Sequence, residues 1–342
     1  MTIALDATYS TGRQLSGVGL YSHEILFGTA AAHPEFRFHF CYRPHAYRNA
    51  RREHLPSNVR RRLILEPFGP RGADLFHGLN QRLPRIHMRR SVATFHDLFV
   101  ISGEYSTPEF RARFTEQARD AATRADLIIA VSQFTRSQVI SLLGVQPSRV
   151  RVVHHGTRRL EFPQAERQKV ILCVGAIQKR KNIARLVKAF EAVDPSWRLV
   201  LAGSAGYGSR EIMARIDNSP ACGRISVTGY ISPEELAGWY AKASIFAFPS
   251  LDEGFGMPVL EAMAAGVPVV TSNRSALPEV AGDAAMLVNP ERSEELAEAL
   301  RRLAQEEELR KELARRGADR ASLFTWEKAV AETWTVYKEL LG

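Results

Sequence analysis

Short apolar runs alternate with helical patterns along the whole chain. The runs at 3–7, 92–95, 127–131 and 170–174 have the length of buried strands, and a stretch with helical periodicity follows each of them. Two parallel strands need a crossover connection between them, and that connection is usually a helix. The alternation therefore predicts an α/β fold built on parallel sheets.

The same pattern predicts the remaining elements. Strands are expected at 36–42, 63–65, 75–77, 150–154, 198–203, 245–248 and 267–270, and helices at 20–31, 108–125 and 293–316. A last helix, 326–342, carries an apolar stripe formed by Trp326, Val330, Trp334, Tyr337 and Leu341. The stripe predicts that one face of this helix is buried in a core.

The length of the chain bounds the number of domains. At 342 residues it suits two domains of about 150 residues each. Residues 158–169 have little periodicity and several charges, so the boundary is placed there. The sequence predicts a first domain at 1–157, a second at 158–325 and the terminal helix at 326–342.

Positive charge is concentrated in the first half of the chain. Residues 1–160 hold 23 arginines and 12 acidic residues, whereas the remainder holds 23 basic and 25 acidic residues. Two arginine clusters comprise Arg48, Arg51, Arg52, Arg60, Arg61 and Arg62, and then Arg82, Arg85, Arg89 and Arg90. They either face an anionic membrane or an acidic acceptor, or they form an ordinary solvated surface. Nucleic acid is not favoured, because no aromatic residues are interleaved with the arginines.

Composition narrows the cellular location. No apolar run approaches the roughly 18 residues of a membrane span, and the first residues lack the basic and apolar regions of a signal peptide. Three widely spaced cysteines fit neither a disulfide framework nor a zinc site. We therefore expect a cytoplasmic protein, either free or peripheral at the inner face of the membrane.

The most informative stretch lies between the strands at 245–248 and 267–270. A loop, Glu253-Gly254-Phe255-Gly256, leads into a short helix that is expected to begin at Pro258 and to stop at Gly266. A second acid, Glu261, lies one turn into this helix. A glycine-bearing loop at a helix N-terminus binds anions. The two carboxylates would repel an anion, so we expect them to point to hydroxyl groups on either side of it, as in a sugar nucleotide. Alternatively, Glu261 only complements the helix dipole.

This stretch resembles the signature of the retaining glycosyltransferases of family 4, the group 1 glycosyltransferases. The similarity consists of Glu-x7-Glu, with Gly-Phe-Gly after the first acid and Ala-x-Ala-x-Gly-x-Pro-Val-Val after the second. The resemblance implies a GT-B fold, in which two Rossmann-like α/β/α domains face a deep interdomain cleft. The first domain is then the acceptor side, the second binds the nucleotide-sugar donor, and the terminal helix crosses back to the first domain.

The resemblance also assigns roles around the two acids. It implies that Glu261 holds the nucleotide ribose, and that Glu253 with the following residues holds the transferred sugar; those residues are Gly254, Phe255, Gly256, Met257 and Pro258. Arg180 and Lys181 precede a predicted helix and suit a diphosphate, although a solvated basic turn has the same residues. The segment resembles the Arg-Lys-Asn variant found in enzymes that transfer mannose, rhamnose or related sugars.

Residues in three further segments follow from the resemblance. Tyr230 and Ile231 lie in a segment whose backbone meets the nucleobase, and Gly17 and Gly19 correspond to a glycine loop near the donor diphosphate. Taken alone, Gly-x-Gly indicates only a tight turn. Thr-Phe-His-Asp-Leu matches a family motif that places His96 beside the transferred sugar as a hydrogen-bond donor, oriented by Asp97, whereas a lone histidine is more often structural.

The sequence thus predicts a metal-independent, retaining transferase for a hexosyl, deoxyhexosyl or pentosyl group, with a GDP-, UDP- or dTDP-sugar as donor and no cofactor. It contains no Asp-x-Asp metal motif. The acceptor is either a lipid-linked cell-surface saccharide or a soluble natural product such as an oligosaccharide antibiotic. Two alternatives stay open: a GT-B epimerase of a sugar nucleotide, and a non-catalytic sugar-nucleotide-binding subunit.

Overall fold

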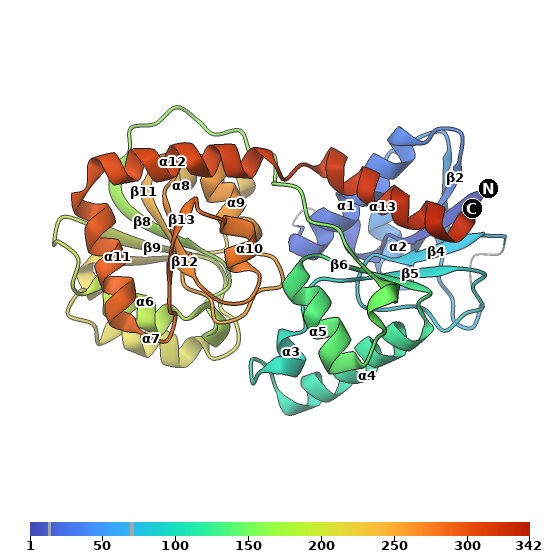
Figure 1. The fold of residues 1–342 in the computed structure, drawn as a ribbon, viewed down its shortest axis with the longest axis horizontal. Helices are drawn as coiled ribbons and strands as arrows, with labels where there is room; N and C mark the ends of the chain where they lie inside the picture. The colour runs from blue at the N-terminus through green and yellow to red at the C-terminus, as the bar shows by residue number, and fades with distance from the viewer. Residues whose placement is uncertain (13–14, 69–71) are drawn as a thin grey trace. The chain divides into compact units, whose positions relative to one another are not determined.

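The computed structural model describes residues 1–12, 15–68 and 72–342. It consists of two compact units, each built around one parallel sheet (Figure 1). Unit 1 comprises Met1–Gly156 and Phe324–Gly342, and unit 2 comprises Thr157–Leu323. The predicted α/β fold with parallel sheets is confirmed.

Within its described residues, unit 1 has a seven-stranded parallel sheet in the order β3-β2-β1-β4-β5-β6-β7. Its strands are β1 (Thr2–Asp6), β2 (Arg37–Tyr42), β3 (Val59–Leu63), β4 (Leu75–Gly78), β5 (Ser91–Phe95), β6 (Leu127–Ala130) and β7 (Val150–Val152). Ile3 of β1 lies opposite Phe38 of β2 on one side and Leu75 of β4 on the other. Since all strands run parallel, their carboxyl ends share one edge, where ligands of such sheets bind.

The helices of unit 1 cover this sheet. They are α1 (Gly17–Ala32), α2 (Pro44–Ala50), α3 (Phe99–Ser102), α4 (Pro108–Arg124), α5 (Gln133–Leu143) and α13 (Trp326–Leu341), with 3-10 turns at Thr8–Ser10 and Pro147–Arg149. Side-chain caps begin several of them: Thr107 accepts from the Phe110 amide, and Ser132 accepts from the Thr135 amide. Gly144, with φ of 69°, ends α5.

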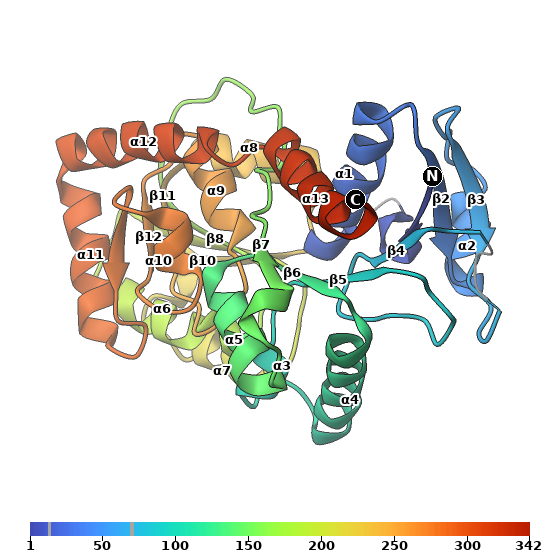
Figure 2. The same ribbon diagram turned by 45° about the vertical axis from the view of Figure 1, so that its right-hand side comes forward.

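The terminal helix α13 is part of the core of unit 1. Its buried side chains Trp326, Val330 and Tyr337 pack with the residues of β1, β2 and β4. Helix α13 lies alongside α1 in both views (Figures 1 and 2). A Cβ atom on Gly28 of α1 would lie 2.6 Å from Val330 Cγ2, so the close approach of the two helices requires glycine there.

Unit 2 has a six-stranded parallel sheet in the order β10-β9-β8-β11-β12-β13. Its strands are β8 (Gln168–Val174), β9 (Arg198–Ala202), β10 (Ile225–Gly229), β11 (Ala243–Phe248), β12 (Val269–Ser272) and β13 (Ala285–Val288). Its helices are α6 (Ile183–Phe190), α7 (Ser209–Asp217), α8 (Pro233–Lys242), α9 (Met257–Ala264), α10 (Leu277–Ala281), α11 (Ser293–Gln305) and α12 (Glu307–Ser322), with 3-10 turns at Lys179–Lys181 and Cys222–Arg224.

Two sequence expectations are corrected here. The single helix expected at 293–316 is wrong, because Glu306 is extended (φ −92°, ψ 92°) and separates α11 from α12. Helix α11 packs against α6 and α12 against α9, so packing sets the break, and the segment contains no Gly or Pro that signals it. The strand expected at 63–65 lies instead at Val59–Leu63. It is an edge strand, and its three consecutive arginines do not show the apolar pattern of a buried strand.

Candidate active site

The predicted loop of unit 2 connects the end of β11 to the first residue of α9. Gly256 has φ of +108°, and a Cβ atom there would lie 2.7 Å from Leu277 Cδ2, so only glycine fits. No side chain caps the start of α9, and the N-terminus of a helix favours an anion. Phe255 is buried and Met257 opens the helix with Pro258 behind it. Of the two glycines in the loop, only Gly256 has a positive φ.

Glu253 is buried between two cations. Its Oε2 atom lies 2.7 Å from Arg180 Nη1, and its Oε1 atom accepts a hydrogen bond of 2.6 Å from Lys181 Nζ. Each of the three residues is 8% exposed. Burial alone raises the pKa of Glu253, but Arg180 and Lys181 outweigh it and lower that pKa to about 2. Glu253 is therefore ionised throughout the physiological pH range.

The cationic segment is fixed to the glutamate loop. The Leu251 amide donates to the Arg180 carbonyl at 2.8 Å, and the side-chain amide of Asn182 donates to the carbonyls of Pro249 and Pro290 at 3.1 and 2.6 Å. Lys181 Nζ also lies 4.4 Å from the centroid of the Phe248 ring, a cation–π contact. Burial lowers the pKa of Lys181, an effect that Glu253 opposes. These contacts hold both cations beside the start of α9.

Glu261 is also buried, at 3% exposed, but has different partners. Its Oε2 atom accepts a hydrogen bond of 2.9 Å from the Tyr240 hydroxyl, and its Oε1 atom lies 3.3 Å from Arg158 Nε. Burial raises the pKa of Glu261, while Arg158 and Tyr240 act in the opposite direction. The first turn of α9 contains no acidic residue, so the interpretation of Glu261 as a dipole-complementing acid is wrong.

The predicted nucleobase segment follows β10. Gly229 has φ of 71°, Tyr230 is 51% exposed and Ile231 is half-buried. The large exposed ring of Tyr230 at the carboxyl end of a strand is accessible to a planar ligand.

In unit 1, the predicted glycine loop is instead the first turn of a helix. Gly17 begins α1, and Ser16 caps the helix by accepting a hydrogen bond of 3.2 Å from the Gly19 amide. A Cβ atom on Gly19 would lie 2.8 Å from the Tyr9 carbonyl oxygen. Gly19 thus allows the 3-10 turn after β1 to pack against α1, which corrects the expectation of a loop.

His96 follows β5 at the carboxyl edge of the sheet in unit 1. Its Nε2 atom lies 2.9 Å from the Leu79 carbonyl oxygen, which only accepts, so Nε2 carries the hydrogen. Nδ1 is buried without a hydrogen-bond partner in the described residues. Burial lowers the pKa of His96 to about 4, so the ring is neutral and Nδ1 is an acceptor. The structure corrects the expected donor role and the orientation by Asp97, which bonds to neither ring nitrogen.

His96 belongs to a buried aromatic cluster. Its ring centroid lies 4.7 Å from Tyr21 and 5.3 Å from His155. Tyr21 and His77 share the hydroxyl of Thr94, each at 2.8 Å, and His77 Nδ1 bonds to the Tyr337 hydroxyl of α13 at 2.6 Å. Burial lowers the pKa of His77 to about 3. This network connects the terminal helix to the ring that packs on His96.

Several arginines of the two clusters have partners within unit 1. Arg61 donates to the Ala50 carbonyl at 2.9 Å, Arg89 pairs with Asp74 at 3.1 Å, and Arg90 donates to the Leu340 carbonyl at 3.0 Å. Arg85 lies 3.8 Å from Glu116. In the described parts of the chain, no helix combines the length and the apolar character needed to cross a bilayer.

Models of known families match both halves of the chain. The model described as Glycosyl transferases group 1 matches residues 157–320, and the one described as Glycosyltransferase Family 4 matches residues 12–158. The chain belongs to the group 1 glycosyltransferases. This membership confirms the resemblance drawn from the two acids and their flanking glycines.

Curated relatives of this group 1 glycosyltransferase include several mannosyltransferases. The O-antigen chain mannosyltransferase B of Escherichia coli is 31% identical over 284 residues, which cover 78% of this chain and 74% of the relative. The MMP alpha-(1->4)-mannosyltransferase of Mycolicibacterium hassiacum is 30% identical over 67% of this chain and 58% of its own length. A D-inositol 3-phosphate glycosyltransferase from Nocardioides is 29% identical over 75% and 62%. The chain thus spans less than two thirds of the last two.

Solved structures confirm the GT-B fold. Sucrose-phosphate synthase from Thermosynechococcus elongatus superposes with a TM-score of 0.78 at 21% identity, over 100% of this chain and 99% of the other. Anabaena HepE, solved in complex with UDP and glucose, gives a TM-score of 0.73 at 19% identity over 99% and 98%. At these identities the likeness concerns the fold.

Sequence reasoning missed several residues of this glycosyltransferase. Tyr240 and Arg158, which contact Glu261, belong to no motif: Arg158 lies in the irregular segment after β7 and Tyr240 in the middle of α8. His77 belongs to no motif either, and nothing in the sequence places it beside Tyr337.

Proposed function

We propose that this chain is a retaining, metal-independent glycosyltransferase that moves a sugar from a nucleoside-diphosphate sugar to a hydroxyl acceptor. The observation that carries the proposal is the burial of Glu253 between Arg180 and Lys181 at the uncapped start of α9. A site of this kind combines a fixed carboxylate, which accepts from sugar hydroxyls, with a concentration of positive charge suited to a diphosphate.

The diphosphate is assigned to Arg180, Lys181 and the amides at the start of α9. Glu253 neutralises one of the two cations, so the cluster keeps one net positive charge. That charge and the helix N-terminus stabilise the diphosphate as its bond to the sugar breaks. Residues already held in place need no reorganisation during the reaction, and they supply the charge that a metal ion would otherwise provide.

The nucleoside is assigned to Glu261 and to the strand end at Tyr230 and Ile231. The Glu261 carboxylate has two oxygens with two lone pairs each. Tyr240 contacts one of these oxygens, Oε2, and Arg158 contacts the other, Oε1. The remaining lone pairs accept hydrogen bonds from the two ribose hydroxyls. Tyr240 and Arg158 are positioning residues in this arrangement, since they act through Glu261.

For the transferred sugar, we assign Glu253 and His96 as hydrogen-bond partners. In the reaction, the bond between the anomeric carbon and the diphosphate oxygen breaks and its electron pair leaves with the diphosphate. The acceptor oxygen forms the new bond on the same face, and its proton passes to the departing diphosphate. The negative charge of Glu253 favours the positive charge that develops on the sugar ring.

Mannose is the sugar that we propose first. The relatives named above include two mannosyltransferases, one of them an O-antigen chain enzyme. On the same ground, a lipid-linked cell-surface saccharide is the acceptor proposed first, with the enzyme in the cytoplasm. A soluble acceptor of the oligosaccharide antibiotic type is the second hypothesis.

A donor panel tests the proposal. The protein is incubated with GDP-mannose, UDP-glucose or dTDP-rhamnose, with and without EDTA, and free sugar, nucleoside diphosphate and isomerised donor are measured. We expect slow release of sugar and diphosphate from one donor, unchanged by EDTA, and thermal stabilisation of about 2.7 kcal/mol at one hundred times the dissociation constant. Isomerised sugar would show an epimerase, and binding without any turnover would show a non-catalytic subunit.

Vesicle flotation separates the two acceptor hypotheses. The arginines of β3 and α2 are mostly exposed, so a membrane-bound acceptor predicts binding to anionic vesicles at low salt that is lost at high salt. A protein that stays unbound at low salt would point to the soluble acceptor.

A further inference from the structure

The carboxyl edge of the sheet in unit 1 concentrates buried polar atoms that lack partners. Arg43 follows β2, Gln81 follows β4 and His96 follows β5. In the described residues, Arg43 Nε and Nη2, Gln81 Oε1 and His96 Nδ1 are buried with no hydrogen-bond partner. Burial of such atoms is costly unless they are paired. Their position after three strands of one parallel sheet indicates a ligand at this edge.

A groove lies at the same edge of unit 1. Its lining consists of Glu66, Arg82, Leu83, Arg85, Arg113, Glu116, Gln117 and Asp120, and its volume is about 300 Å³. Glu66 follows β3, Arg82 follows β4, and the rest of the polar lining comes mainly from α4. A second hollow of about 610 Å³ shares Arg85, Glu116 and Asp120 with the groove.

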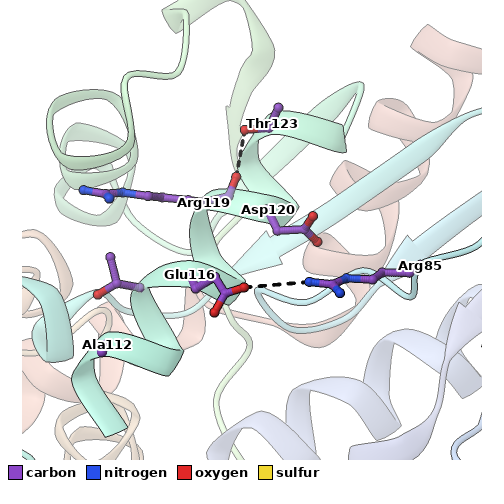
Figure 3. Close-up of a pocket in the computed structure, with 7 residues that line it drawn as sticks. Arg85, Ala112, Glu116, Arg119, Asp120 and Thr123 are labelled. Carbon is purple, nitrogen blue, oxygen red and sulfur yellow. Dashed lines mark hydrogen bonds and ion pairs between the residues drawn. The ribbon is translucent and has the colours of Figure 1, made fainter. Parts of the chain in front are cut away.

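Figure 3 shows the second hollow, in which Arg85 and Glu116 point toward each other from different segments. Asp120 extends from α4 on the side of Arg85. This exposed ion pair marks the division between the groove and the second hollow, so a ligand longer than one sugar has room on both sides of it.

Hydrogen bonds and ion pairs hold the segments on both sides of the groove. Arg124 of α4 donates to the carbonyls of Leu83 and Pro84 at 2.8 and 2.9 Å and pairs with Asp120 at 2.7 Å. It therefore ties the segment after β4 to α4. Arg43 and Glu66, on the other side, pair at 3.0 Å. A site held by several such contacts is organised before the ligand binds.

The charges of the groove are balanced. Three arginines, Arg82, Arg85 and Arg113, face three acids, Glu66, Glu116 and Asp120. The side chains of Arg82 and Gln117 make no hydrogen bond or ion pair with any described residue. A balanced lining gives no net attraction to a phosphate or a carboxylate. Instead, donors and acceptors side by side suit hydroxyl groups, which both donate and accept.

Electrostatics connect the groove with the strand ends next to it. Asp6, the last residue of β1, is buried, which raises its pKa, while the Thr8 hydrogen bonds and the charges of Arg43 and Arg82 oppose the rise. Arg43 and Arg82 therefore lie near one carboxylate from two different strands. This proximity places the unpartnered guanidinium atoms of Arg43 and the groove residue Arg82 in one region of unit 1.

We propose that this groove binds an uncharged, hydroxyl-rich saccharide, the sugar portion of the acceptor. The assignment of the ligand as acceptor rests on the proposed glycosyltransferase function. Arg82 and Gln117 contact the sugar directly, and the segment with Gln81 lies behind them. Arg82 thus binds the acceptor. The arginine clusters of the sequence had instead suggested that this residue contacts an anionic membrane.

Titration of the protein by NMR with methyl α-D-mannopyranoside tests the proposal, with mannose 6-phosphate as the charged comparison. Wild type binds the neutral glycoside, and the Arg82→Ala and Gln117→Ala variants bind it roughly tenfold more weakly. Arg89→Ala, which removes an arginine paired with Asp74 outside the groove, binds it as wild type does. The phosphorylated sugar binds no more tightly than the neutral one.

The outcomes separate this proposal from the donor-site function. Binding of GDP is measured in the same proteins, and we expect Arg82→Ala and Gln117→Ala to leave it unchanged because both residues belong to unit 1. Absence of nucleotide binding in wild type would overturn the proposed function. The glycoside titration would still test whether the groove binds a neutral saccharide. Equal glycoside affinity in all variants, no glycoside binding in wild type, or preference for the phosphate would overturn the groove proposal.

Discussion

Unit 1 and unit 2 share a fold but bury opposite kinds of polar group at the carboxyl edges of their sheets. Unit 1 buries His77, His96 and His155, and burial lowers the pKa of each, to about 3 for His77 and about 4 for His96. Unit 2 buries an ionised carboxylate, Glu253, whose pKa is about 2 because two cations surround it. The buried histidines of unit 1 are thus neutral, whereas the buried Glu253 of unit 2 is charged.

The difference follows from the partners that each unit supplies. The ring nitrogens of His77 contact hydroxyl groups and His96 contacts a carbonyl, neither of which carries charge that would favour an imidazolium. Glu253 instead has Arg180 and Lys181 within ion-pair distance. A neutral edge suits hydroxyl recognition and a charged edge suits a diphosphate, which is the division of labour proposed for the two units.

The largest effect that we expect is that acid lowers the stability of unit 1 much more than that of unit 2. The folded-state pKa of His77 and of His96 lies below the unfolded value of 6.5, so their contribution to stability is present above pH 6.5 and is lost as pH falls toward 4. Between pH 6.5 and pH 5 each of the two histidines lowers the free energy of unfolding by about 1.4 kcal/mol per pH unit, so unit 1 loses about 4 kcal/mol of stability. Hydrogen exchange should show amides of α13 and β4 losing protection.

Unit 2 provides the internal control. Because the pKa of Glu253 is lowered, its contribution to the stability of unit 2 is lost only below the unfolded value of 4.5. Because the pKa of Glu261 is raised, mild acid increases the stability of unit 2 through this residue. Amides of α9 and β11 should therefore keep their protection between pH 6.5 and 5. Equal loss of protection in both units over that range would contradict the contrast.

The substitution Glu253→Gln should have the largest effect on catalysis. It keeps the shape of the side chain but removes the negative field that favours a positive sugar ring, so turnover should fall roughly a hundredfold. Affinity for the nucleoside diphosphate should not weaken, because Arg180 and Lys181 then carry two unneutralised charges. Turnover is measured with saturating donor, and affinity by competition.

Glu211→Gln is the matched control for this substitution. Glu211 is an exposed acid that pairs with Lys179 at 2.9 Å, next to the same cationic segment. Its loss should leave turnover unchanged. If both variants lose turnover alike, the effect of Glu253 comes from the general charge of the region and not from the buried ion pairs.

Local features of the sequence predicted the loop and short helix that carry Glu253 and Glu261, but not the partners of these two acids. Pro258 and Gly266 bracket a short helix in any context, and Gly266 indeed has φ of +66°. The pairing of Glu253 with Lys181 joins residues 72 positions apart, and Arg158 reaches Glu261 from even farther along the chain. Such contacts depend on strand order, which the hydrophobic pattern does not encode.

Errors arose where packing overrides local signals. Ser16 caps a helix at Gly17 although two glycines suggested a loop, because the cap hydrogen bond and the contact of Gly19 with Tyr9 favour the helix. Similarly, no helix breaker precedes Glu306, yet the chain turns there to pack two helices on different neighbours. The parallel α/β class was nevertheless predictable, since it depends only on the alternation of apolar runs and helical periodicity.

His96→Ala tests the neutral edge of unit 1. If Nδ1 accepts a hydrogen bond from a sugar hydroxyl, the loss costs about 2 kcal/mol in the transition state, or roughly thirtyfold in turnover. Donor affinity should change far less. His87→Ala, which removes an exposed histidine of the same unit, should behave as wild type. Turnover within about threefold of wild type would make His96 a structural residue.

The turnover of wild type should also lack a histidine inflection. Because burial lowers the pKa of His96 to about 4, its ring stays neutral from pH 5 to 8. A turnover profile that changes near pH 6.5 and loses this change in His96→Ala would contradict a neutral acceptor.

Glu261→Gln should have a smaller effect of a different kind. Glu261 is assigned to the ribose, which does not change during the reaction, so its loss removes binding equally from ground state and transition state. The donor Michaelis constant should rise roughly tenfold, the equivalent of one charge-assisted hydrogen bond, with turnover nearly unchanged. Equal effects of Glu253→Gln and Glu261→Gln on both constants would mean that neither carboxylate has its assigned role.

Arg158→Met should have the smallest effect, and one that is visible only through pH. Burial raises the pKa of Glu261 and Arg158 opposes this rise, so removing Arg158 should raise the pKa further. Ribose hydroxyls bind the ionised carboxylate, so nucleoside diphosphate affinity should decline at a higher pH in the variant than in wild type. At pH 8 the two proteins should bind alike. Arg215→Met, which breaks the pair with Glu191 in unit 2, should keep the wild-type profile. A uniform loss of affinity at every pH would instead show that Arg158 supports the fold or contacts the nucleotide, and that it does not control the charge of Glu261.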